Sequence, residues 1–283
     1  MRLGMNLLLW TTQVTEQHHP LLADLKEAGY DGAEIPIGQG DTPYYRALGA
    51  ELDRLGLART AVTSLDAATN ACSPDKAIRA AAKDRLRWAV SMAHEVGAEL
   101  LVGPFHSAFK EFSGEPPTAD ERAWSAECLA VAAEEAAQAG IRLAIEALNR
   151  FECYLVTTQA ESRALVDAVG HPSLGMLYDT HHAHIEEKDP RAAIRTGGDK
   201  IFHVHTSESD RGVPGKGQVR WRETFEALAA QDYQGWFAIE AFSRRDPGFA
   251  SAINVWREFD DAEDIWRQGQ TFLRSAWADP PGT

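Results

Sequence analysis

The chain has 283 residues, of which 44% are hydrophobic and 25% charged, as in a soluble globular protein with one large α/β domain or two small ones. Its formal net charge of −14 argues against a nucleic-acid backbone as the main partner, because so acidic a protein repels phosphates unless it keeps a basic patch. The three cysteines are widely spaced and contain no Cys-x-x-Cys pair, so neither a disulfide framework nor a zinc ribbon is suggested, and a reducing cytoplasm fits.

Apolar runs alternate with amphipathic segments from the N-terminus onward. The first run, 3–9, is too short for a signal peptide and lacks a small-residue cleavage site, so we expect a strand there. Further strands are predicted at 32–37, 58–65, 99–105, 142–148, 174–179, 201–206 and 236–242. Helices are predicted at 20–28, 43–56, 74–96, 118–139, 158–169, 190–196, 221–230 and about 248–277, and many of them end before a glycine. Residues 280–282 read as a tail, and no stretch is long enough to cross a membrane.

Eight strands that alternate with helices predict a (β/α)₈ TIM barrel. We expect one domain over residues 1–283, with the segment 248–277 packed on the barrel as helix. A doubly wound open sheet is the alternative. The barrel is favoured because polar residues end strands five to eight. In a barrel these strand ends converge on one mouth, whereas in an open sheet they are too far apart to share an ion.

Each of the last four predicted strands ends in a residue that can bind a metal. A charge at the end of a buried strand needs a partner or a metal. Three carboxylates and an imidazole, with no thiolate, suit one divalent ion of the Mn²⁺, Mg²⁺ or Co²⁺ type better than structural zinc. Any one of them alone fits a buried ion pair equally well, but four at matching strand ends favour a metal. These residues are Glu146, Asp179, His205 and Glu240.

Several histidines are candidates for positions near the mouth of the barrel. His203 and His205 share a strand face, so we expect His205 at the mouth and His203 packed one layer below. His182, three residues after Asp179, can turn back into the mouth. His181 and His184 are expected to be solvated loop residues.

Four segments together resemble the motifs of the ketose 3-epimerases, a family of the xylose isomerase-like barrel superfamily that includes D-tagatose, D-psicose (D-allulose) and L-ribulose 3-epimerases. The likeness covers nearly the whole chain, and the motifs occur in the right order. They are Glu-Ala-Leu-Asn-Arg-Phe-Glu at 146–152, Asp-Thr-His-His at 179–182, His-Val-His-Thr-Ser-Glu-Ser-Asp-Arg at 203–211 and Ile-Glu-Ala-Phe at 239–242.

The resemblance implies that the four strand-end residues named above bind the metal. It also implies that the sugar hydroxyl and carbonyl oxygens are held by Glu152, His182 and Arg211. One departure lies in the first strand, where several family members carry aromatic residues near position 6 and this chain has Asn6. We therefore expect a different pocket around the distal sugar carbons, with Asn6 and Phe242 among the substrate contacts.

Inversion at C3 of a 2-ketose removes a weakly acidic proton next to a carbonyl and returns it on the other face. One divalent ion per chain, Mn²⁺ ahead of Co²⁺ or Mg²⁺, stabilises the enolate charge as a Lewis acid. Glu146 and Glu240 come from strands five and eight, so they can flank the substrate and exchange the roles of base and acid through a cis-enediolate. We hypothesise an isomerase for free ketoses of the D-psicose/D-fructose, D-tagatose/D-sorbose or L-ribulose/L-xylulose type.

Three further features have structural explanations. The glycine-rich loop 211–218 lacks the Walker pattern, so a flexible loop that closes the pocket is preferred to a phosphate cradle. Glu34 and His106 also lie near strand ends, where structural roles explain both. Trp256, Trp266 and Trp277 are expected to pack on the outer helices, and apolar surface left over would form the contact of a homodimer or homotetramer.

Other functions on the same barrel stay open. Hydroxypyruvate isomerases, inosose dehydratases and 3-dehydroshikimate dehydratases share a similar metal site, and Glu152 with Arg211 favours the epimerase over them. A zinc nuclease of the endonuclease IV type is disfavoured because the third strand ends in Ser64-Leu65-Asp66 without a histidine, and because DNA binding needs cationic contacts. A non-catalytic barrel is the third alternative, since a fold alone does not prove activity.

Overall fold

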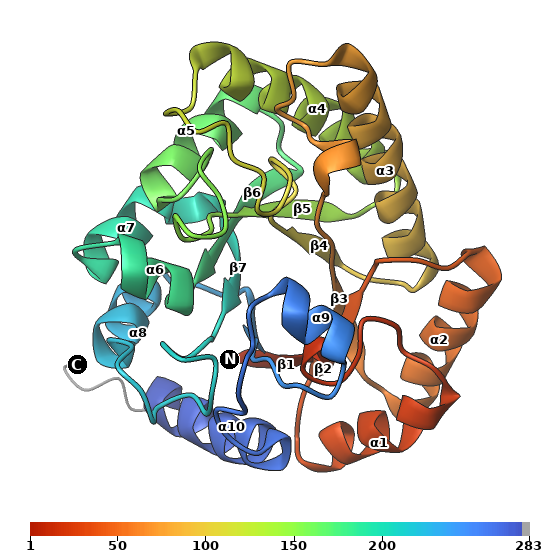
Figure 1. Ribbon diagram of the computed structural model, residues 1–283. Coiled ribbons are helices and arrows are strands. Elements are labelled where there is room, and N and C mark those ends of the chain that lie inside the picture. Colours follow the sequence, from red (N-terminus) through yellow and green to blue (C-terminus); the bar gives the residue numbers. More distant parts are fainter. Residues whose placement is uncertain (279–283) are drawn as a thin grey trace.

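Eight parallel strands close into a barrel in the computed structural model, which describes residues 1–278 (Figure 1). The first and last strands pair and complete the ring, with Gly4 opposite Ala238. The tail predicted at 280–282 lies outside the described residues. The strands are β1 (Arg2–Asn6), β2 (Gly32–Pro36), β3 (Ala58–Val62), β4 (Leu100–Gly103), β5 (Arg142–Glu146), β6 (Leu174–Asp179), β7 (Ile201–His205) and β8 (Trp236–Ile239).

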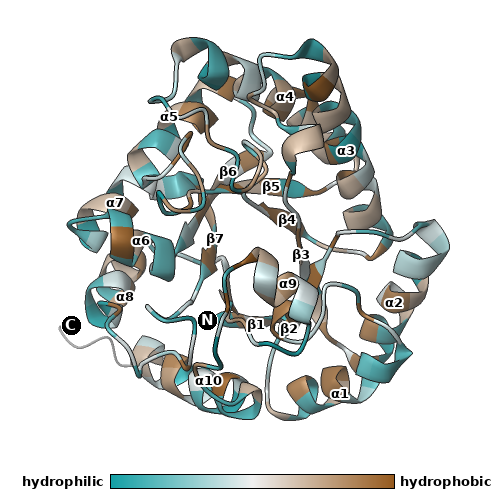
Figure 2. Ribbon diagram, viewed as in Figure 1, coloured by the Kyte–Doolittle hydropathy of each residue, from teal (hydrophilic) through white to brown (hydrophobic). Residues whose placement is uncertain are grey.

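Helices surround the ring of strands. In Figure 2 the strands at the centre are largely apolar, while the outer helices mix apolar and polar residues, as expected for helices with one face on the barrel and one in water. Among residues 1–278, no helix is long and apolar enough to span a bilayer. The α-helices are α1 (His19–Glu27), α2 (Thr42–Leu55), α3 (Lys76–Glu95), α4 (Ala119–Gln138), α5 (Gln159–Val169), α6 (Thr180–Glu186), α7 (Pro190–Gly197), α8 (Trp221–Ala230), α9 (Pro247–Ala252) and α10 (Ala262–Ala278).

Side chains fill the inside of the barrel directly below its mouth. The alternation of side chains along β5 places Ala144 and Glu146 on the same face. Ala144 belongs to a small apolar cluster that closes the barrel interior, so Glu146 stands on a packed floor. The cluster consists of Val62, Leu100, Val102, Ala144 and Leu177. A larger apolar layer lies between the strands and the helices, which is the usual division of a TIM barrel.

Local capping explains two departures from the predicted elements. The first strand ends at Asn6 instead of residue 9, because the side chain of Asn6 accepts a hydrogen bond from the backbone N–H of Leu8 and starts a 3₁₀ turn, η1 (Leu7–Leu9). Residues 180–186 form α6 and not a loop. Asp179 caps this helix by accepting hydrogen bonds from the N–H groups of His181 and His182. His184 is exposed as expected, but it lies on this helix.

The C-terminal segment is also less regular than predicted. It divides into α9 and α10, and the residues between them, 253–261, are not helical. α10 packs on α8 and β8. Trp266 is fully buried and Trp277 packs on Phe225 and Phe237, whereas Trp256 is 65% exposed. The expectation that all three tryptophans pack inward is therefore wrong for Trp256, which lies in the irregular stretch.

Candidate active site and metal centre

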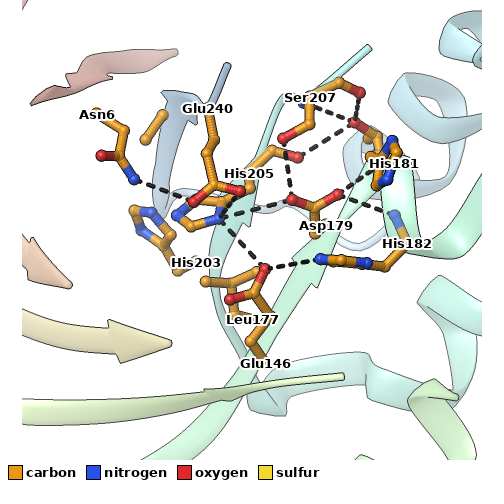
Figure 3. Close-up of polar contacts among 12 residues, drawn as sticks. Asn6, Glu146, Leu177, Asp179, His181, His182, His203, His205, Ser207 and Glu240 are labelled. Carbon is orange, nitrogen blue, oxygen red and sulfur yellow. Dashed lines mark hydrogen bonds and ion pairs between the residues drawn. The ribbon is translucent and has the colours of Figure 1, made fainter. Parts of the chain in front are cut away.

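The four residues predicted as metal ligands meet at one point in the mouth (Figure 3). Three of them end their strands: Glu146 ends β5, Asp179 ends β6 and His205 ends β7. Glu240 follows the last residue of β8. Each offers one ligand atom, all four atoms lie within 4.8 Å of one another, and all four residues are buried. Four strand ends thus converge as the barrel geometry requires.

His205 is the centre of this cluster. Its Nδ1 lies 3.5 Å from Glu146 Oε1, 3.7 Å from Asp179 Oδ2 and 3.4 Å from Glu240 Oε2. Among residues 1–278, His205 Nδ1 and Glu146 Oε1 are buried without a hydrogen-bond partner, which is uncommon for polar atoms inside a protein. Oxygen-rich ligation with one imidazole suits a divalent cation such as Mn²⁺. The donor set therefore fits the predicted metal.

Burial and neighbouring charges shift the pKa values of these groups in different directions. Burial raises the pKa of Glu146 to about 8, and the charges of Glu240 and Asp179 act in the same direction. Burial alone would lower the pKa of His205, but the carboxylates of Glu240 and Glu34 outweigh it and raise that pKa well above its usual range. Burial opposes ionisation of Asp179 as well, yet the charge of Arg211 holds the pKa of Asp179 well below its ordinary value.

Arg211 reaches into the cluster from the loop after β7. Its Nη1 lies 3.1 Å from Asp179 Oδ2 and 2.9 Å from Glu240 Oε2. The guanidinium carbon lies 4.8 Å from the ring centre of Phe242, a distance at which a cation is attracted to an aromatic face. The backbone of Arg211 has φ +66°, a left-handed conformation that non-glycine residues seldom adopt. The loop is thus shaped to turn this side chain inward.

His182 belongs to the wall of the same site. Its Nδ1 accepts a hydrogen bond of 3.1 Å from the backbone N–H of Asn149, and its Nε2 lies 3.6 Å from Glu146 Oε1. Burial lowers the pKa of His182 well below its usual range, so the ring is neutral. His181, expected in a solvated loop, is half-buried instead. Its Nδ1 lies 3.0 Å from the carbonyl oxygen of Ser209, which ties α6 to the loop after β7.

A cavity of about 640 Å³ opens onto two of the four predicted ligands, Glu146 and Glu240. Glu152, His182, Arg211 and Phe242 line it, as do Glu146 and Glu240. Burial raises the pKa of Glu152. The far side is mostly apolar and includes side chains of α9 and the segment after it, which lie over the mouth in Figure 1. From this segment, the cavity wall takes Phe249, Ala252, Ile253, Val255 and Phe259.

Asn6 lies below the cavity wall. Its side chain is fully buried, and its Nδ2 donates hydrogen bonds to Glu34 Oε1 at 2.9 Å and to Glu240 Oε1 at 3.1 Å. Asn6 is absent from the residues that line the cavity. The structure therefore brings Asn6 against a predicted metal ligand, apart from the residues that line the cavity.

Glu34 has a larger part in this site than the structural role expected from the sequence. Its fully buried Oε1 lies 2.7 Å from His205 Nε2, and its Oε2 lies 2.9 Å from His203 Nε2. Thr60 donates to Glu34 Oε2 at 2.7 Å. A carboxylate on the outer nitrogen of a metal-binding histidine fixes the orientation and tautomer of the ring. The pattern that would have found it is a lone glutamate inside the apolar strand 32–37.

His106, also expected to have a structural role, supports the end of β5. Its Nε2 lies 2.9 Å from the backbone carbonyl oxygen of Glu146. Burial lowers the pKa of His106 to about 4, so the neutral ring donates its Nε2 hydrogen to that carbonyl. This contact fixes the backbone that carries Glu146.

Comparison with known proteins gives consistent names. A family model described as a xylose isomerase-like TIM barrel matches residues 22–276. A ketose 3-epimerase of Arthrobacter globiformis is 31% identical over 97% of this chain and 96% of its own length. A D-psicose 3-epimerase of Agrobacterium fabrum is 31% identical over 94% of this chain and 93% of its own. A crystal structure of D-allulose 3-epimerase from Methylomonas sp. in complex with D-allulose superposes with a TM-score of 0.91 at 30% identity, covering 97% of this chain and 96% of that one.

Proposed function

Because this chain belongs to the xylose isomerase-like TIM barrel family, and within it to the ketose 3-epimerases, we propose that it is a metal-dependent epimerase that inverts C3 of a free 2-ketose. It is an enzyme of the isomerase class that acts on carbohydrates. The observation that carries metal dependence is the cluster of four buried ligands, two of whose atoms find no other partner among residues 1–278. The names of these relatives support neither the dehydratase nor the nuclease alternative.

The cation would be held by Glu146, Asp179, His205 and Glu240. Mn²⁺ is the expected ion, with Co²⁺ or Mg²⁺ as alternatives, because three of the four ligands are carboxylates. When bound, it supplies Lewis-acid stabilisation of the negative charge that develops on the substrate oxygens.

Two carboxylates share the proton transfer. Glu146 and Glu240 approach the cluster from opposite sides in Figure 3. One takes the proton from C3 and leaves a planar cis-enediolate, and the other gives a proton to the opposite face of C3. In the reverse reaction the two exchange roles.

The remaining polar residues of the cavity hold the sugar. We assign Glu152, His182 and Arg211 to the hydroxyl and carbonyl oxygens, because all three line the cavity beside the ligands. Phe242 is assigned to the apolar wall. The role expected for Asn6 changes: since it donates to Glu240 Oε1, we propose that it orients Glu240 and does not touch the sugar.

Deuterium exchange at C3 tests the mechanism. Wild-type enzyme with Mn²⁺ is expected to exchange the C3 proton of D-psicose, D-tagatose or L-ribulose with solvent, whereas Glu146→Gln and Glu240→Gln abolish the exchange. Metal content of each variant is measured in parallel, so that loss of the ion is distinguished from loss of the base. Exchange at the wild-type rate in both variants would rule out the two-carboxylate mechanism.

The predicted homodimer or homotetramer and cytoplasmic location stay predictions. Three aromatic side chains in loops after β4, β5 and β8 support self-association, because large exposed apolar groups often mark an interface. They are Phe112 at 49%, Phe151 at 70% and Trp256 at 65% exposure. All three cysteines are buried and free, which agrees with a reducing compartment. Light scattering during size-exclusion chromatography measures the number of subunits.

A further inference from the structure

Another buried carboxylate, Glu208, lies outside the metal cluster and has no part in the proposed proton transfer. Glu208 is fully buried. Its Oε1 accepts hydrogen bonds from the backbone N–H groups of Ser209 at 2.8 Å and Val219 at 3.0 Å. Its Oε2 accepts from the backbone N–H of Gly215 at 2.8 Å and from Trp221 Nε1 at 2.9 Å. The carboxylate of Glu208 thus accepts hydrogen bonds from four donors that lie within residues 209–221.

These contacts explain the glycines of the loop after β7. Backbone N–H groups that converge on an anion form a nest, as in phosphate-binding loops. In this chain the anion is the carboxylate of Glu208 itself. A Cβ at Gly217 would lie 2.5 Å from Glu208 Oε1, and Gly215 has φ +92°. The glycines therefore let the backbone close around an internal carboxylate and not around a phosphate.

The same loop carries Arg211. The backbone N–H of Arg211 donates to the carbonyl oxygen of Glu208 at 3.0 Å. The next anchor is the N–H of Val213, which donates to Asp260 Oδ2 at 2.8 Å. Between these two anchors Arg211 keeps its left-handed backbone and is only 8% exposed. Its guanidinium is thus directed at Asp179 and Glu240 by a loop that has fixed points on both sides.

We propose that Glu208 is a positioning residue for Arg211: its carboxylate acts as an internal clasp that holds residues 209–219 in one conformation before substrate arrives. The loop is then a preordered wall of the cavity, and not the flexible cover that its glycines suggest in the sequence. The part of this inference that concerns catalysis rests on the proposed function, because Arg211 is taken to hold a ketose oxygen.

Replacement of Glu208 by Gln tests the clasp with little change of shape. An amide nitrogen in place of one carboxylate oxygen faces two N–H donors, so two of the four hydrogen bonds are lost and two donors are left unpaired. We expect kcat/KM for a ketose at saturating Mn²⁺ to fall about 10²-fold, the effect of moving a positioning group by about 1 Å. The matched control is Glu223→Gln on α8, because the ion pairs of Glu223 within residues 1–278 are those with Arg191 and Arg220.

A double-mutant cycle asks whether Glu208 acts through Arg211. In an Arg211→Ala background, Glu208→Gln is expected to cause no further loss of kcat/KM, because the group that it positions is already absent. If the two losses multiply, Glu208 supports the fold in general and the positioning role is wrong.

Hydrogen exchange of the loop gives a measurement that needs no substrate. The amides of Ser209, Gly215 and Val219 are expected to be protected in the wild-type protein and in Glu223→Gln, and to lose protection in Glu208→Gln, with Mn²⁺ affinity unchanged. Retained protection in Glu208→Gln would overturn the clasp. If the wild-type protein inverts no ketose while the exchange result holds, the proposed function fails and the clasp stands.

Discussion

Replacement of Glu34 by Gln should weaken metal binding without touching a metal ligand. The carboxylate of Glu34 lies 2.7 Å from His205 Nε2, on the side of the ring away from Nδ1, and it is fully buried. When Nδ1 binds a metal, Nε2 carries the ring proton and needs an acceptor. The Glu34 carboxylate supplies a charged acceptor at that point, and a neutral amide supplies a weaker one.

The expected loss of affinity is about 10- to 100-fold, the range for groups that hold a metal-binding histidine, and this corresponds to about 1.4–2.8 kcal/mol. The control is Thr60→Val, which removes the donor to Glu34 Oε2 but leaves the contact between Oε1 and His205 in place. Its effect on affinity should be smaller than that of Glu34→Gln.

Isothermal titration of chelator-stripped protein with Mn²⁺ at constant pH measures both variants. We expect Glu34→Gln to bind one ion per chain with lower affinity than the wild-type protein. Circular dichroism should show that the variant is folded. Wild-type affinity in Glu34→Gln would refute the reasoning, because His205 would then need no acceptor on Nε2.

Three other predictions concern pH, orientation and packing. Burial raises the pKa of Glu146 to about 8 in the metal-free protein, so a proton must leave before this carboxylate binds a cation. The Mn²⁺ affinity measured by titration should rise between pH 6 and 8 by about tenfold per pH unit for each proton displaced, and an affinity independent of pH would contradict this. Asn6→Ala removes the donor to Glu240 Oε1. It should lower kcat about tenfold with metal still bound, as expected when a group that orients a ligand is lost. Unchanged steady-state kinetics would show that Glu240 needs no such support. Trp266→Ala removes a fully buried ring of α10 and should lower the free energy of unfolding by about 3–5 kcal/mol. Urea denaturation measures this change, and the metal stoichiometry should stay at one. A change below about 1 kcal/mol would mean that the core closes over the gap.

The barrel and the positions of the predicted metal ligands follow from local patterns. Each strand is an apolar run bounded by a polar residue or a glycine, and the polar residue at the end of β5, β6 or β7 marks the mouth. The start of α4 is local in the same way, since Thr118 and Glu121, three residues apart in the chain, form a capping box. Such features depend on residues close together in the chain, so periodicity and capping rules detect them.

Contacts between distant strands determined the rest. Glu34 reaches His205 across 171 positions and Asn6 reaches Glu240 across 234, and no local pattern shows which buried polar groups will face one another. The loop after β7 depends on the same kind of contact: its glycines indicate freedom in the sequence, whereas in the fold the carboxylate of Glu208 accepts hydrogen bonds from the N–H groups of Gly215 and Val219. The sequence by itself determined eight strands, the last four of which carry a carboxylate or a histidine at or next to their ends, because side-chain alternation and burial are local. Only the closed ring decided which polar side chains meet in one cluster, which contact a member of that cluster and which accept hydrogen bonds from a loop, because hydrogen bonds depend on ångström distances that tertiary packing sets.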